Sequence, residues 1–201
     1  MKHFSGPFSI SVMLLLVPIC FGLSGCAGAL VGVGTAAVAA STTEKGFATS
    51  VADQTIRAKI LDRFIKTNVN FITGVDVSVN DGSVMLTGKV KNDEEKHTVT
   101  KIIWSIKGVR EVINELQITE TTSLKDIAKD AAAAAKLRIT LGADPEISSL
   151  NYDIDVVNGT IYLSGIAANS TEMNKVIEHA QNVQFAKEVK NYITLQTDKR
   201  D

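Results

Sequence analysis

The chain has 201 residues, with 21 Lys and Arg against 22 Asp and Glu, which gives a formal net charge of −1. This balance leaves no basic surplus of the kind that nucleic-acid binding uses, so we expect no nucleic-acid partner. Only two cysteines occur, which excludes a disulfide framework, and no Cys-x-x-Cys or His-x-x-x-His spacing predicts a metal or cofactor site.

The first 25 residues are typical of a secretory signal. Lys2 and His3 form a short basic head, residues 8–21 are largely apolar, and Leu23-Ser24-Gly25-Cys26 follows. This ending resembles a bacterial lipobox, which implies cleavage before Cys26 and acylation of its thiol and new amino group. The alternatives are an ordinary signal with an incidental cysteine, or an uncleaved anchor. Cys20 leaves with the signal, so lipidation also explains why the mature chain keeps a single cysteine.

The segment after Cys26 bears on the destination of the chain. Ala27 stands where an Asp retains lipoproteins in the inner membrane of enteric bacteria, so the resemblance implies an outer-membrane anchor with the chain facing the periplasm. Residues 27–40 contain only Ala, Gly, Val, Leu and Thr. They are too short to span a bilayer, which needs about 20 apolar residues. We expect residues 26–49 to be a tether that is either flexible or associated with the membrane surface.

A first folded unit is expected over residues 50–119. Ser50-x-x-Asp53 resembles a capping box at a helix start, and the turn chemistry at residues 80–82 is typical of a hairpin. Carboxylates at residues 93–95 open a second helix, which Gly108 ends. The apolar periodicity predicts the order helix, strand, strand, helix and strand. The apolar positions are Ala52, Ile56, Ile60 and Phe64 in the first helix; Val75, Val77 and Val79 in the first strand; Val84, Leu86 and Val90 in the second strand; Val99, Ile102, Ile103 and Ile106 in the second helix; and Val109, Val112, Ile113, Leu116 and Ile118 in the third strand.

A second unit, over residues 120–197, repeats the first at an offset of 77 residues. The segment from Gly82 to Gly88 returns as Gly159 to Gly165, and the register holds without a gap over residues 76–114. This long match indicates a duplicated domain rather than a shared local motif. We interpret the four glycines as backbone positions at turns and strand ends, because no phosphate-binding glycine motif surrounds them.

The order of elements, the Gly-x-Val-x-Leu-x-Gly hairpin and the Gly-Val-x-x-Val-x-Asn segment at residues 108–114 resemble a BON domain. The resemblance implies an α+β fold of two tandem domains, each α-β-β-α-β with a three-stranded sheet and two helices on one face. Units of about 70 residues are marginal for a core, so we expect the two to dock on each other. Phe185-Ala186 replaces Gly108-Val109 in the second copy, so we expect its helix-to-strand corner to be built differently.

Two BON domains behind a lipobox resemble outer-membrane lipoproteins of this family. The resemblance implies a role in envelope integrity through phospholipid binding, or alternatively recruitment of an envelope protein, with no catalysis and no small-molecule substrate. The residues agree about catalysis: His97 and His179 occupy non-equivalent repeat positions, and no serine lies in Gly-x-Ser-x-Gly. Asp153 and Asp155 share a strand face, but Asp153 repeats Asp76, which indicates a structural role.

One surface on the second helix stands out as a candidate contact. At about 100° per residue, Trp104 falls well off the apolar stripe, and His97 and Lys101 share its direction. An exposed Trp between basic residues suits a bilayer interface or a protein partner, whereas the alternative is packing against the other domain or the linker. Residues 120–201 carry nine basic and twelve acidic residues, so net charge does not favour anionic lipid at the second domain.

Overall fold

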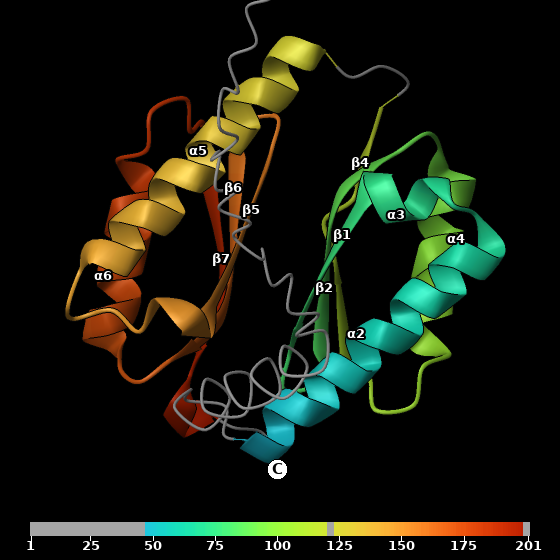
Figure 1. Ribbon diagram of the computed structural model, residues 1–201, viewed down its shortest axis with the longest axis horizontal. Coiled ribbons are helices and arrows are strands. Elements are labelled where there is room, and N and C mark those ends of the chain that lie inside the picture. Colours follow the sequence, from blue (N-terminus) through green and yellow to red (C-terminus); the bar gives the residue numbers. More distant parts are fainter. Residues whose placement is uncertain (1–46, 120–122, 199–201) are drawn as a thin grey trace, which may run out of the picture.

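Two units of the same architecture form the described part of the chain, residues 47–119 and 123–198 of a computed structural model. In each unit helices cover one face of a sheet, and the two sheets face each other in the middle of the molecule (Figure 1). The prediction of two α+β domains, each with its helices on one face, is confirmed. The predicted signal (1–25), Cys26 and almost all of the predicted tether (26–49) lie outside the described residues.

The first unit has the predicted order with two additions. Strand β2 lies in the centre, antiparallel to β1 and parallel to β3 and β4. A short helix precedes β1, and the predicted third strand is interrupted at Glu115 and Leu116. The elements are α2 (Phe47–Thr67), α3 (Asn70–Gly74), β1 (Val75–Asn80), β2 (Ser83–Val90), α4 (Asp93–Trp104), β3 (Glu111–Asn114) and β4 (Gln117–Ile118).

The second unit repeats this arrangement with an uninterrupted third strand. Strand β6 is central, antiparallel to β5 and parallel to β7. The elements are α5 (Leu124–Ala143), η1 (Ser149–Asn151), β5 (Tyr152–Val157), β6 (Thr160–Ala167), α6 (Ser170–Gln181), β7 (Glu188–Leu195) and η2 (Gln196–Asp198).

The predicted capping box at the first helix is wrong. Helix α2 already includes Phe47, so Ser50 lies inside the helix and cannot cap its start. Capping does occur at α4 and α6, where Asn92 Oδ1 accepts the N–H of Glu95 at 2.9 Å and Asn169 Oδ1 accepts the N–H of Glu172 at 3.0 Å. In return, Oε2 of each glutamate accepts the backbone N–H of the residue just before the cap, Lys91 or Ala168, at 2.9 Å. The reciprocal bonds satisfy donors that a helix start leaves unpaired.

The hairpin glycines occupy positions where an added side chain would collide with the backbone. Gly82 and Gly159 have φ of 74° and 84°, and the residues before them are also in the left-handed region, which suits a tight two-residue turn. A Cβ on Gly88 would lie 2.3 Å from a backbone carbonyl oxygen, and one on Gly165 would lie 2.1 Å from the equivalent oxygen. The hairpin therefore brings two backbones closer than any L side chain permits.

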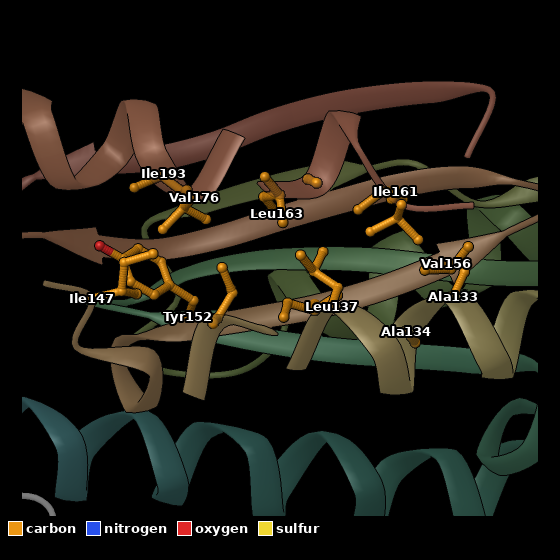
Figure 2. Packing of buried hydrophobic residues seen from close by; sticks show 14 of the residues in the cluster. Ala133, Ala134, Leu137, Ile147, Tyr152, Val156, Ile161, Leu163, Val176 and Ile193 are labelled. Atoms are coloured by element: carbon orange, nitrogen blue, oxygen red, sulfur yellow. The ribbon is translucent and has the colours of Figure 1, made fainter. Parts of the chain in front are cut away.

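Each domain has its own hydrophobic core between its sheet and its helices. Figure 2 shows the second core, where side chains of α5, β5, β6 and α6 meet in one layer. Its central members are Leu137, Leu141, Ile161, Leu163 and Val176. In the first core the corresponding layer is formed by Ile60, Phe64, Val84, Leu86, Val99 and Ile103.

The helix-free faces of the two sheets pack against each other. Met85, Val157 and Tyr162 form a third apolar cluster there, with Ile113 and Tyr192 beside it. Met85 and Tyr162 occupy the same position in the two repeats, 77 residues apart. Equivalent residues that meet each other are the mark of a two-fold contact, here between two halves of one chain. The domains therefore dock as expected, sheet on sheet, and their helix layers face outward.

Candidate contact surfaces

Trp104 lies at the end of α4, on the outward side of the first domain. Its side chain is 55% exposed, and His97 and Lys101 are exposed as well, while Val99 and Ile103 of the same helix are fully buried. Thr100, one turn before Trp104, accepts a hydrogen bond from Asn114 of β3 at 2.7 Å. The tryptophan therefore lies toward the β3 margin of the helix layer, and packing against the other described domain does not cover it.

A seam of polar side chains links the two domains beside the apolar cluster. The carboxylate of Glu115 accepts the Nζ of Lys190 at 2.7 Å and the hydroxyl of Tyr192. Burial alone would raise the pKa of Glu115, but these two hydrogen bonds, together with the positive charges of Lys190 and Lys96, lower that pKa below its usual value. Burial and the bond to Glu115 raise the pKa of Tyr192 to about 12. Glu115 and Tyr192 are again repeat equivalents, 77 residues apart. Glu115 lies in the interruption between β3 and β4, where its carboxylate accepts both hydrogen bonds from the second domain.

A groove of about 610 Å³ lies elsewhere between the domains, between α3 and β1 of the first domain and α5 and β5 of the second. Asp76 and Asp155 lie on its opposite walls. Burial and the nearby Asp155 carboxylate raise the pKa of Asp76, against the opposing effect of Arg57 and Arg138. Asp153, the repeat of Asp76, accepts the side-chain amide of Asn80 at 3.2 Å, so this carboxylate contributes to the contact between the domains.

Two buried aspartates have a role that the sequence pattern did not reveal. Asp53 accepts the backbone N–H groups of Asp81 and Gly82 at 2.9 and 3.0 Å. Asp130, 77 residues later, accepts those of Asn158 and Gly159 at 2.7 and 2.8 Å. Each carboxylate therefore ties the first helix of its domain to the hairpin turn. The offset of 77 residues between Asp53 and Asp130 was the sequence signal that could have identified them as equivalent residues.

The prediction of a different helix-to-strand corner in the second domain is wrong. Phe185 has a φ of 73°, in the same left-handed region as Gly108, whose φ is 106°. The N–H of the next residue bonds three residues back at 3.2 Å in both corners, and the hydrogen bond to the hairpin glycine carbonyl is 2.8 Å in both. The fold therefore imposes one backbone geometry, and an exposed Phe adopts it at a cost of about 1–2 kcal/mol.

Residues 47–119 and 123–198 hold no group of three or more His, Cys, Asp or Glu that could bind a metal ion. His179, one of two histidines in the described residues, contacts the carboxylate of Asp144 at 2.9 Å. The described residues offer contact surfaces and an interdomain groove.

Comparison with known proteins gives two matches to a family model, the BON domain, at residues 52–120 and 129–197. A protein of Anaplasma centrale, named as an uncharacterized protein in the gshII 5′ region, is 34% identical over 128 residues, which is 63% of this chain and 85% of that protein. Outer membrane lipoprotein DolP of Haemophilus influenzae is 26% identical over 168 residues, 83% of this chain and 86% of its own.

Among solved structures, the C-terminal domain of CdsD, a structural protein of the type III secretion system of Chlamydia trachomatis, is 17% identical. The alignment covers 69% of this chain and 66% of that domain, with a TM-score of 0.27. A TM-score this low carries no argument about shared function.

Proposed function

The chain belongs to the BON-domain family, and from this premise we propose that it is a non-catalytic outer-membrane lipoprotein that faces the periplasm and maintains envelope integrity by contact with phospholipid. The observation that carries the proposal is the order of its parts, a lipobox followed by a tether and two BON domains. The similarity to the DolP lipoprotein over 83% of the chain supports it.

In this proposal residues 1–25 are a cleaved signal, residues 26–49 an acylated tether, and residues 50–119 and 120–197 the two domains. Residues 47–119 and 123–198 include no helix long and apolar enough to cross a bilayer. Acyl chains at Cys26, palmitate among them, supply the anchor, since stable membrane attachment takes more than one chain. The folded domains then act at the membrane surface.

Flotation with vesicles tests the phospholipid contact. The mature chain from residue 26, with Cys26→Ala, removes the contribution of the acyl chains. We expect it to float with vesicles of phosphatidylethanolamine containing phosphatidylglycerol, and to float less as salt is raised, because basic side chains near an anionic surface are screened by ions. Failure to float with these vesicles, at low or high salt, contradicts the phospholipid contact and leaves the lipid anchor as a separate question.

The exposed Trp104 supports a second function, recruitment of an envelope protein. An aromatic side chain that is 55% exposed, flanked by His97 and Lys101, is typical of contact surfaces. Trp104→Ala is expected to leave stability nearly unchanged and to weaken capture of a crosslinked envelope protein. A loss of several kcal/mol of stability with capture intact contradicts a surface role. Because Trp104 is the only tryptophan, a blue shift of its fluorescence with vesicles assigns this face to lipid.

A further inference from the structure

An apolar stripe lies on the surface of the first domain, on the side of α2 and α3 that is not in the core. It consists of Leu61, Ile65, Val69 and Ile72, between 37% and 67% exposed, and we name it the α2–α3 stripe. Leu61 and Ile65 lie one turn apart on α2, which ends at Thr67. Val69 lies in the turn that follows and Ile72 on α3, and the N–H of Ile72 bonds to the carbonyl of Val69 at 3.0 Å.

The core does not account for this stripe. Helix α2 already buries Ile56, Ile60 and Phe64 on its other side. The fold does not require it either, because the repeat provides a control: at the same offset the second domain has Arg138, Gly142, Glu146 and Ser149. A row of exposed aliphatic side chains in one copy, with polar residues and glycine in the other, marks an interaction surface.

We infer that the α2–α3 stripe is the surface on which the first domain rests against the phospholipid leaflet. The inference rests on the proposed function and assigns that membrane contact to one domain and one face. Helix α2 is the first described element after the proposed anchor, and the 21 residues from Cys26 to Phe47 reach at most about 70 Å. An anchored chain therefore holds this helix within reach of the lipid surface at high effective concentration.

The charges of α2 favour an anionic surface. The helix carries Arg57, Lys59, Arg63 and Lys66 against two carboxylates. One of them, Asp53, is buried in the hairpin contact, and the other, Asp62, is paired with Lys66 at 2.7 Å. At about 100° per residue, Lys59, Arg63 and Lys66 form one edge of the exposed face of α2 and the stripe forms the other edge, with Arg57 beside it. An exposed helix face with both apolar and basic side chains suits a membrane interface, with about 1 kcal/mol per basic residue near an anionic leaflet.

The geometry separates this stripe from Trp104. Arg57, one turn before Leu61, is close enough to Asp76 of β1 to oppose the rise in its pKa, so this side of α2 lies toward the β1 margin of the sheet. Trp104 lies toward the β3 margin, beside Thr100 and its bond to β3. A flat leaflet that covers the stripe therefore leaves Trp104 uncovered and free for a protein partner.

The test uses the mature chain with Cys26→Ala, which then contains no cysteine, so that one introduced cysteine carries an environment-sensitive fluorophore. Ile65→Cys labels the stripe, and Ile139→Cys on α5, where the native side chain is 68% exposed, is the matched control. With vesicles of phosphatidylethanolamine and phosphatidylglycerol we expect a blue shift at position 65, and none at position 139 or at Trp104.

Binding constants provide the second measurement. We expect Ile65→Ser with Val69→Ser to weaken partition into the same vesicles at least about tenfold, and Ile139→Ser to change it less than about twofold. All these positions are exposed, so circular dichroism and the melting temperature are expected to match wild type.

The outcomes separate the two proposals. If the parent chain does not bind vesicles, both the lipid role and this inference fail. If it binds and the double variant binds equally well, or if position 139 or Trp104 shifts with position 65, the inference alone is overturned. A dimer in light scattering that the double variant abolishes also overturns it, because the stripe then contacts a second copy of the chain.

Discussion

Removal of one hydroxyl from the seam, by Tyr192→Phe, is expected to destabilise both domains. That hydroxyl belongs to the second domain and donates to Glu115 of the first. A hydrogen bond to a charged group contributes about 1.5–3 kcal/mol. Glu115 keeps its 2.7 Å bond with Lys190, so we expect a loss near the lower end, about 1.5 kcal/mol. Glu115→Ala removes both bonds and is expected to lose about 2–3 kcal/mol, with a coupling of about 1 kcal/mol in the double variant.

Two probes of urea unfolding separate docked domains from independent ones. Trp104 is the only tryptophan and lies in the first domain, whereas far-ultraviolet circular dichroism follows both domains. We expect Tyr192→Phe to shift both transitions together to lower urea. If the Trp104 transition keeps its wild-type midpoint while the other moves, the domains unfold independently and the seam does not couple them.

The pH dependence of the same variants has a definite sign. Glu115 has a lowered pKa in the folded chain, so it contributes stability above the pKa of an unfolded Glu, about 4.3. That contribution is lost as pH falls through the lower folded pKa. The difference between wild type and Glu115→Ala is therefore expected to be full at neutral pH and to shrink below about pH 4.

Three further substitutions test other parts of the structure. Phe185→Gly is expected to raise the free energy of unfolding by about 0.5–1 kcal/mol, because Gly adopts the positive φ without strain; a lower melting temperature contradicts this. Asp130→Ala leaves two backbone N–H donors of the hairpin turn unpaired and is expected to lower the free energy of unfolding by about 2–4 kcal/mol, and Asp53→Ala is expected to do the same at the equivalent turn. A loss of less than about 0.5 kcal/mol in urea unfolding of either variant contradicts the contact. Asp76→Asn is expected to stabilise the chain at neutral pH, because burial and Asp155 raise the pKa of Asp76; the gain disappears as pH falls below the pKa of unfolded Asp, about 3.9, and a stability difference independent of pH contradicts this cause.

Much of each domain was predictable from local patterns. The alternation at Val84 and Leu86 places both side chains on the core face, and both are fully buried. The hairpin turn follows from Asp81 and Gly82, whose residue types tolerate positive φ. Such features depend only on residues a few positions apart along the chain, so the local sequence is enough to predict them.

Other features depend on partners that are distant along the chain. Asp53 lies three residues after a serine, which is the spacing of a capping box, but its partners are at the turn 28 residues later. Met85 and Tyr162 lie on the strand faces that alternation assigns to solvent, and only the docking of the second sheet buries them. Phe185 has a residue type that favours a different corner, and the tertiary fold overrides that preference.

The α2–α3 stripe was also hidden in the sequence, for a different reason. Leu61 and Ile65 belong to a helix whose apolar positions are numerous enough to supply the core by themselves, through Ile60 and Phe64. Periodicity alone does not separate buried apolar residues from surplus ones. The exposed fractions and the comparison of the two repeats identify the surplus.

The N-terminal peptide of the protein, isolated from the outer-membrane fraction, tests the central claim most directly. Mass spectrometry is expected to find a chain that begins at Cys26 and carries acyl chains on its thiol and amino group, and Cys26→Ala is expected to abolish acylation and release the chain from that fraction. A membrane-associated chain with unmodified Cys26, or one that keeps residues 1–25, contradicts the proposal that this BON-domain protein is a lipoprotein.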